Sequence, residues 1–404
     1  MPNLAPPKHR LRWRIALAGV ALTVVTWTVP VRAQETRQQQ IADLQGDKAG
    51  RLAVEGPDRA EQAIVRIMNS PLLAGSGGAF PWFGSVYEGT KFGFGGGYLR
   101  RMPRSSQLTT IAAISVNGST LLRADYVGPR LLRDRIEPYV SFRWARAKDV
   151  SFYGIGNDSL GTERTGYDFD PAVVSAGIAY RAHEWLTATV GYESIGFETH
   201  VIGSSLDPSI LESLSDNTRL RFNGSHLGVS FDSRTSPGYS TRGTLLRVST
   251  SYYSETQDRP FEFRQNELEA VQLVPLVREQ FVLAFRGLAT FTNPDAANGA
   301  PLALLPYLGS GTTLRGFANR RFIDRDSVVL TGEYRWRPSR FVDMAVFLDA
   351  GQVAPASDAF TWDRMKTSWG IGARFHGPAF SAFRVEVAHS VEGYHLVFTT
   401  GQPF

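Results

Sequence analysis

The sequence predicts an all-β fold, a transmembrane antiparallel β-barrel. Three observations support this prediction: an export signal at the N-terminus, segments of about ten residues in which apolar and polar side chains alternate, and the absence of a second apolar span. The chain of 404 residues is long enough for one large domain or for two to three ordinary ones.

The first 33 residues have the pattern of a secretory signal peptide. Basic residues come first, an apolar run follows at 15–29, and Val31 and Ala33 place small residues at the −3 and −1 positions of a cleavage site. We therefore expect the mature protein to begin at Gln34 after removal of residues 1–33. The alternative is an uncleaved N-terminal anchor.

Charge and cysteine content narrow the class of protein. Five of the 43 basic residues and none of the 38 acidic residues lie in 1–33, which leaves 38 of each sign in the mature chain. A neutral mature chain gives no electrostatic reason to expect nucleic acid as a partner. The chain has no cysteine, so a disulfide framework is excluded. An exported protein of this kind is either soluble in the periplasm or a barrel in the outer membrane.

We expect residues 34–81 to form a polar and helical N-terminal segment ahead of a barrel at 82–404. Asp58 and Glu61 have the spacing of a helix capping box. An apolar helical stripe follows, formed by Ala60, Ala63, Ile64, Ile67 and Met68.

From residue 82 onward the chain reads as strands. Between 328 and 338, Leu330 and Tyr334 alternate with Glu333 and Arg335, so one face of the strand is apolar and the other polar. A soluble β-sandwich shows the same alternation with its apolar face inward. The segment length of about ten residues favours the tilted strand of an outer-membrane barrel.

We count fifteen candidate strands, five of which follow a long interval at 292–326. A loop of this length usually has a functional role. They are 92–101, 107–117, 120–127, 135–147, 168–181, 185–196, 220–232, 243–255, 261–276, 280–292, 327–337, 341–351, 368–376, 381–390 and 394–402. One further strand is expected within 82–90 or 148–166.

Two motifs resemble a known family. Leu314-Arg315-Gly316-Phe317 is similar to the tip of the sixth extracellular loop in the bacterial surface antigen superfamily, and Phe347-Leu348-Asp349-Ala350-Gly351 resembles its Phe-x-Asp-x-Gly strand signature. That superfamily includes the barrel-assembly insertase and the two-partner-secretion transporters. The resemblance is specific from about Ser230 to Phe404.

The resemblance implies sixteen strands, with an inward-folded loop between strands 11 and 12. Glu333 and Asp349 fall on the polar faces of their strands, so both should face the lumen and pair with Arg315, whose forked guanidinium suits carboxylates. The alternative is a solvent-exposed loop arginine and two unrelated lumen charges.

The last strand resembles the sorting signal of outer-membrane barrels. Its aromatic and apolar residues all have even numbers, so an uninterrupted strand would place them on the same face: Tyr394, Leu396, Phe398 and the terminal Phe404. Pro403 cannot donate to a strand ladder, so we expect pairing only as far as about Gly401.

The resemblance implies a role in protein assembly, protein translocation or lipid transport at the outer membrane. The alternatives are a passive channel or structural barrel and, as a minor one, an outer-membrane enzyme. Only 47 residues separate Gln34 from Phe80, too few for a periplasmic polypeptide-transport-associated domain. The expected partners are outer-membrane lipid, the barrel-assembly machinery during biogenesis, and a separate periplasmic protein.

No motif predicts catalysis, a cofactor or a metal. The glycines at 93–97 lack the third glycine of a dinucleotide fingerprint, Ser240 is not in a nucleophile elbow, and the histidines have no metal-ligand spacing. We therefore expect a protein that is not an enzyme.

We predict that the mature protein starts near Gln34 and resides in the outer membrane. Cell fractionation should recover it with the outer membrane, and its gel mobility should change on boiling because a folded barrel resists detergent. Recovery in the periplasm without a heat-dependent shift would contradict the prediction.

Overall fold

The computed structural model describes residues 77–202, 219–235, 239–257, 261–277, 279–295, 299–339, 342–376, 381–399 and 404. The chain divides into two units, Met1–Glu61 and Gln62–Phe404. All of the described residues belong to the second unit, and the description below concerns that unit alone. No helix within the described residues has the length and apolarity to span a membrane.

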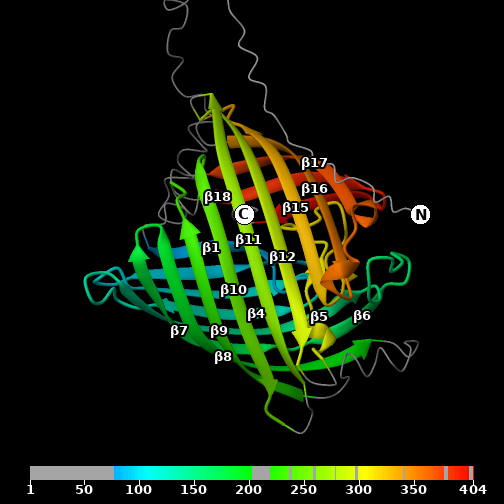
Figure 1. Ribbon diagram of the computed structural model, residues 1–404, viewed down its shortest axis with the longest axis horizontal. Helices are drawn as coiled ribbons and strands as arrows, with labels where there is room; N and C mark the ends of the chain where they lie inside the picture. The colour runs from blue at the N-terminus through cyan, green and yellow to red at the C-terminus, as the bar shows by residue number, and fades with distance from the viewer. Residues whose placement is uncertain are drawn as a thin grey trace, which may run out of the picture. The chain divides into compact units, whose positions relative to one another are not determined.

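The second unit is a single large antiparallel sheet with a few short additions (Figure 1). Its seventeen strands are β1 (Gly78–Ser85), β2 (Phe92–Arg101), β3 (Gln107–Ser115), β4 (Thr120–Val127), β5 (Ile136–Phe152), β6 (Thr165–Phe169), β7 (Ala172–His183), β8 (Leu186–Ile202), β9 (Arg219–Asp232), β10 (Gly243–Glu255), β11 (Glu262–Val277), β12 (Phe281–Pro294), β15 (Asp326–Trp336), β16 (Val342–Ala354), β17 (Lys366–His376), β18 (Ser381–Ser390) and β19 (Gly393–Thr399). A two-stranded sheet, β13 (Tyr307–Leu308) with β14 (Phe322–Ile323), and the 3₁₀ turns η1 (Leu302–Leu304), η2 (Ser357–Ala359) and η3 (Trp362–Arg364) complete the elements.

Each strand of the large sheet pairs with the next strand along the chain. The two exceptions are local. Strands β6 and β7 both lie between β5 and β8, β6 against their last residues and β7 against the rest, so these two occupy one position in the sheet. Strand β12 pairs directly with β15, and the chain between them carries β13 and β14. With β6 and β7 taken together the sheet is sixteen strands wide, eleven before this loop and five after it.

The two faces of the sheet are inverted relative to a soluble protein. Outward-facing Phe285 and Leu348 are 50% and 55% exposed, whereas inward-facing Asp349 and Arg374 are fully buried. Water would penalise so much exposed apolar surface, and a hydrocarbon environment would not. The alternation therefore places the apolar face toward lipid, and the soluble sandwich is excluded.

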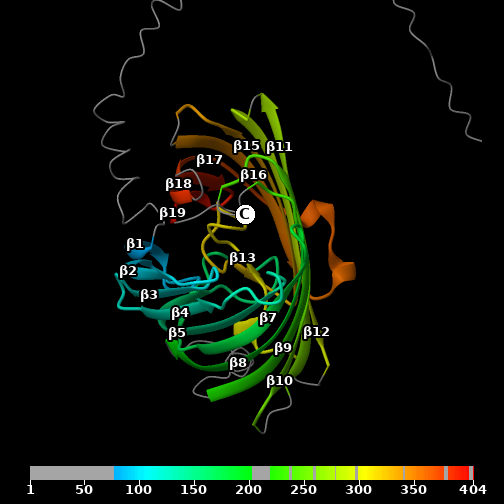
Figure 2. The same cartoon turned by 90° about the vertical axis from the view of Figure 1, so that its left-hand side faces the viewer.

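The first and last strands meet without a backbone ladder. No paired register joins β1 to β19 within the described part of the chain, but the Phe83 ring of β1 lies 6.3 Å from the Phe398 ring of β19. Phe398 also contacts Phe92 of β2 and Phe383 of β18, at 5.6 Å and 5.9 Å between ring centroids. Figure 2 shows β19 in red beside β1 in blue, so the sheet closes on itself through side chains at this seam.

The sequence located fifteen strands. It did not separate β6 from β7, and it missed β1, which overlaps the interval 82–90 where a further strand was expected. This strand begins at Gly78, which is four residues ahead of the expected barrel boundary at 82. Pro81 and Gly84 interrupt the alternation of apolar and polar residues in this strand, so its sequence does not show a clear strand pattern. The predicted signal peptide and N-terminal helix lie outside the described residues.

Candidate functional site: the inward loop and its ion pairs

The chain between β12 and β15 folds into the interior of the barrel (Figure 2). Its apolar side chains are buried: Leu308, Leu314, Phe317 and Phe322 form a cluster with Val329 and Val353 of the wall. Burial of four large apolar side chains from one loop stabilises its inward position, since each contributes roughly 1.5–3 kcal/mol. The loop is therefore packed against the inner wall.

Arg315 at the centre of the loop binds two carboxylates of the wall. Its Nε and Nη2 donate to the two oxygens of Asp349 at 2.9 Å and 2.7 Å, and its Nη1 donates to Glu333 Oε1 at 2.7 Å. The guanidinium carbon lies 3.4 Å from the centroid of the Phe347 ring. The Arg315 side chain is 1% exposed, so these contacts replace all of its hydration.

A third carboxylate and three more arginines complete the network. Glu386 of β18 lies 3.3 Å from Arg315 Nη1, and it accepts from Arg374 Nη2 at 3.0 Å and from Arg384 Nη1 at 2.6 Å. Arg374 also donates to both oxygens of Glu333, at 2.9 Å and 2.7 Å.

Arg335 adds a donation to Glu333 Oε2 at 2.7 Å. The cluster therefore contains four arginines and three carboxylates. Both oxygens of Asp349, Glu333 and Glu386 are occupied by protein donors. Carboxylates occupied in this way are suited to holding positive groups in place, and the site has the character of a structural anchor.

Glycine is required at two points where the loop touches the wall. A Cβ on Gly316 would lie 2.6 Å from Ser368 Cβ and 2.9 Å from the His389 carbonyl oxygen. A Cβ on Gly351 would lie 2.9 Å from the Val328 carbonyl oxygen. Gly316 does not have a positive φ angle, so close approach to β17 and β18 explains this glycine.

The sequence-predicted residues fall into three groups. The structure brings together Leu314, Arg315, Gly316, Phe317, Glu333, Phe347, Asp349 and Gly351. The side chains of Tyr394 and Leu396 point outward and are 74% and 72% exposed, and Phe398 lies at the seam.

Phe404 departs from the expected strand. Strand β19 ends at Thr399, and the Phe404 ring lies 4.8 Å from the guanidinium of Arg335 on the inner wall. It packs against the buried cluster that contains Leu245 and Val282. Its parity with Tyr394 therefore does not place it on the lipid face.

Sequence reasoning missed Arg374, Arg384 and Glu386. All three lie on the inner faces of β17 and β18. The alternation of inward and outward residues that identified Glu333 could therefore also have identified them. It also missed Arg321, which binds two other loops. Arg321 Nε donates to Glu392 at 2.8 Å and its Nη1 donates to Ser159 Oγ at 2.8 Å.

No group of three or more metal-ligating side chains comes together within the described residues. The buried charges of the Arg315 network lie in ion pairs with the wall, whereas the guanidinium of the buried loop residue Arg320 lies 4.4 Å from the centroid of the Tyr307 ring.

The Omp85 superfamily domain matches residues 108–404, nearly three quarters of the chain. The chain belongs to the Omp85 superfamily. The resemblance seen in the loop and strand motifs is thereby confirmed, and the superfamily is one of outer-membrane β-barrels. No curated protein sequence matches this Omp85 chain.

Solved structures agree with the fold. BamA from Haemophilus ducreyi lacking POTRA domains 1–3 is 14% identical with a TM-score of 0.60, over 80% of this chain and 69% of that one. CdiB from Escherichia coli is 13% identical with a TM-score of 0.54, over 80% of this chain and 61% of that one. CdiB from Acinetobacter baumannii is 12% identical with a TM-score of 0.51, over 80% of this chain and 58% of that one. At these identities the likeness concerns the fold, and this Omp85 chain spans about three fifths of each CdiB.

We predict that Arg315→Ala destabilises the barrel by about 3–5 kcal/mol and exposes the loop to protease, because the buried Asp349 loses the arginine that it pairs with. Arg315→Lys should rescue only partly, since a point charge lacks the forked geometry. Unfolding of the refolded barrel in denaturant, with limited proteolysis, measures both effects.

The control is Arg325→Ala, an exposed arginine of the same loop, which should change stability by no more than about 0.5 kcal/mol. Asp349→Ala should resemble Arg315→Ala, and the double variant should be little worse than either single one. Additive losses in this cycle would show that the two residues do not interact.

Proposed function

We propose that this Omp85 chain is an outer-membrane barrel that inserts or translocates polypeptides at the seam between β1 and β19. The observation that supports the proposal is the contrast between this seam and the rest of the sheet. Neighbouring strands elsewhere are joined by paired registers, such as the eight residue pairs of β1 with β2. At the seam, Phe83 and Phe398 meet through their rings.

The energetic difference makes the seam the weakest line in the wall. A ladder bond contributes roughly 0.5–1.5 kcal/mol net in water, and its loss in hydrocarbon costs several kcal/mol because no water replaces it. An aromatic contact contributes only about 0.5–1.5 kcal/mol beyond its buried area. Parting β1 from β19 therefore costs less than parting any ladder. The backbone edges exposed there favour pairing with an incoming strand.

The inward loop acts as a fixed plug in this proposal. Arg315 holds it to Asp349, Glu333 and Glu386 while the seam opens elsewhere. Arg321 connects the same loop to two other loops through its hydrogen bonds to Ser159 and Glu392. The lumen then stays occupied, and passage of solutes is limited.

Export and partners complete the proposal. Residues 1–33 would direct the chain out of the cytoplasm and be cleaved near Ala33. The outward Tyr394 and Leu396, with Phe398, would present the terminal strand to the barrel-assembly machinery. Outer-membrane lipid surrounds the apolar face, and a separate periplasmic protein would deliver the client. The proposed role involves no catalysis.

Locking the seam tests the function. The chain has no cysteine, so Phe83→Cys with Phe398→Cys can be joined by a short bismaleimide without side reactions. We expect the locked barrel in liposomes to lose its ability to accelerate folding of a urea-denatured eight-stranded outer-membrane protein. Folding is measured by the heat-dependent gel shift of that client.

The matched control joins Val387→Cys to Leu396→Cys, which face each other across the β18–β19 ladder. That lock should leave the acceleration unchanged, since these strands are already paired. Equal activity of both locked barrels would argue against the seam as the working site.

Conductance separates this proposal from a passive channel. Because the loop occupies the lumen, the intact protein in planar bilayers should show a small, fluctuating conductance. Deletion of residues 308–319 should enlarge it, whereas Arg325→Ala should not. A large, steady conductance of the intact protein would favour the passive channel.

A further inference from the structure

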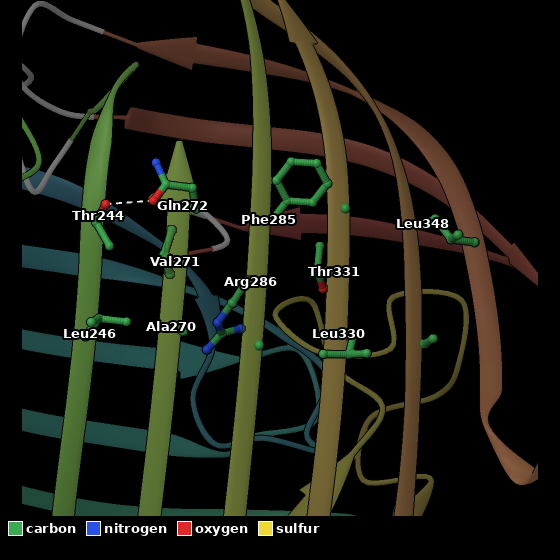
Figure 3. A pocket seen from close by; sticks show the side chains of 13 residues that line it. Thr244, Leu246, Ala270, Val271, Gln272, Phe285, Arg286, Leu330, Thr331 and Leu348 are labelled. Carbon is green, nitrogen blue, oxygen red and sulfur yellow. Dashed lines mark hydrogen bonds between the residues drawn. The ribbon is translucent and has the colours of Figure 1, made fainter. Parts of the chain in front are cut away.

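The outer face of β10, β11, β12, β15 and β16 carries a groove with a volume of about 570 Å³. Figure 3 views it from the lipid side, with Leu246, Phe285, Leu330 and Leu348 around it. This size falls within the roughly 300–1,000 Å³ of small-molecule sites. Its lining is apolar, apart from Thr244 and Gln272 at one end and the inward-pointing Thr331 and Arg286.

The groove exists because small residues occupy neighbouring positions on the outer face of β11, β12 and β15. Ala270 of β11 pairs directly with Gly287 of β12, and Phe285 of β12 pairs with Gly332 of β15. Each of these residues lies on the outer face. The missing side chains leave a hollow bordered by the larger residues of the neighbouring strands.

The protein itself does not require these glycines. A Cβ on Gly287 would meet Leu330 at 3.5 Å, and one on Gly332 would meet the Phe285 ring at 3.9 Å, both ordinary contacts. Neither glycine has a positive φ angle. By contrast, a Cβ on Gly95 would lie 2.1 Å from the Ala112 carbonyl oxygen. A glycine inside a strand destabilises that strand, and the close approach of a ligand is one of the reasons for which such a glycine occurs.

The groove has a polar end and an apolar end. At the polar end Thr244 Oγ1 donates to Gln272 Oε1 at 2.7 Å. This end lies toward Tyr334 and Trp336, whose stacked rings are two and four residues beyond Gly332 on β15. Aromatic rings gather where a bilayer meets water, so the groove starts just inside the interface and continues toward the bilayer centre.

The lining offers no outward charge. Arg286 is among the lining residues, but its side chain turns inward, where its Nε lies 2.8 Å from Glu269 Oε1. A glycolipid rich in phosphate would be expected to need basic residues at the polar end. An uncharged hydroxyl and amide suit the ester region of a phospholipid.

We propose that this groove binds one acyl chain of a phospholipid, with Thr244 and Gln272 beside its ester region. The occupant follows from the polarity gradient along the groove and from its continuity with the lipid-facing surface. A flexible hydrocarbon chain fills an irregular apolar hollow that the protein leaves open. The groove lies on the apolar outer face of the sheet, whereas the Arg315 network lies on the polar inner face. The proposal for the groove therefore does not depend on the role proposed for the seam.

A photoactivatable phospholipid tests the proposal. The full chain is reconstituted in liposomes that contain phosphatidylcholine with a diazirine on one acyl chain, and labelled peptides are identified by mass spectrometry. In the wild type, labelling should concentrate on the strands that carry Ala270, Gly287 and Leu330. Gly287→Phe fills the groove and should reduce labelling there to the level of other strands.

The matched control is Ala176→Phe, which adds the same ring to the outer face of β7 and should leave the labelling of the groove unchanged. If Gly287→Phe does not refold, Ala270→Leu fills the groove from the opposite strand. Labelling spread evenly round the barrel, or unaffected by filling, overturns the proposal. Crosslinks between two copies of the chain that Gly287→Phe abolishes would assign the groove to a protein interface and also overturn it.

Discussion

The fork between Arg315 and Asp349 is the contact on which the interior depends. A guanidinium that is 1% exposed has exchanged its water for the oxygens of Asp349, Glu333 and Glu386. The idealised cost of burying one such charge is of order 20 kcal/mol, and only good geometry offsets it. The network provides that geometry, and the positions of the loop, the wall glycines and Phe347 all follow from it.

The interior of this barrel combines two kinds of packing that soluble proteins keep apart. The loop contributes an apolar cluster around Leu314 and Phe317, while the wall contributes the ion pairs. The outer face needs no packing partner of its own because lipid covers it. The loop therefore adds an apolar cluster to those that the wall strands form by themselves, such as the one that contains Leu245 and Val282.

The fold and half of the anchor could be predicted from the sequence. The alternation of apolar and polar residues located the strands and predicted that Glu333 and Asp349 face inward. This was possible because the face on which a strand residue lies follows from its neighbours in the sequence. The register between two strands depends on residues far apart in the sequence. The sequence pattern therefore could not predict that Glu386 lies beside Arg315. Pro403 limits the pairing of the last strand, but the place of Phe404 beside Arg335 and Leu245 depends on residues far away in the sequence, which the local pattern does not reveal.

The position of the anchor along the chain has a kinetic consequence. Arg315 meets Glu333, Asp349 and Glu386 at separations of 18, 34 and 71 residues, whereas Arg321 meets Ser159 across 162. Loop-closure entropy rises with separation, and contacts close in sequence form first. The loop and the last five strands can thus assemble as a nucleus, onto which the N-terminal strands close late.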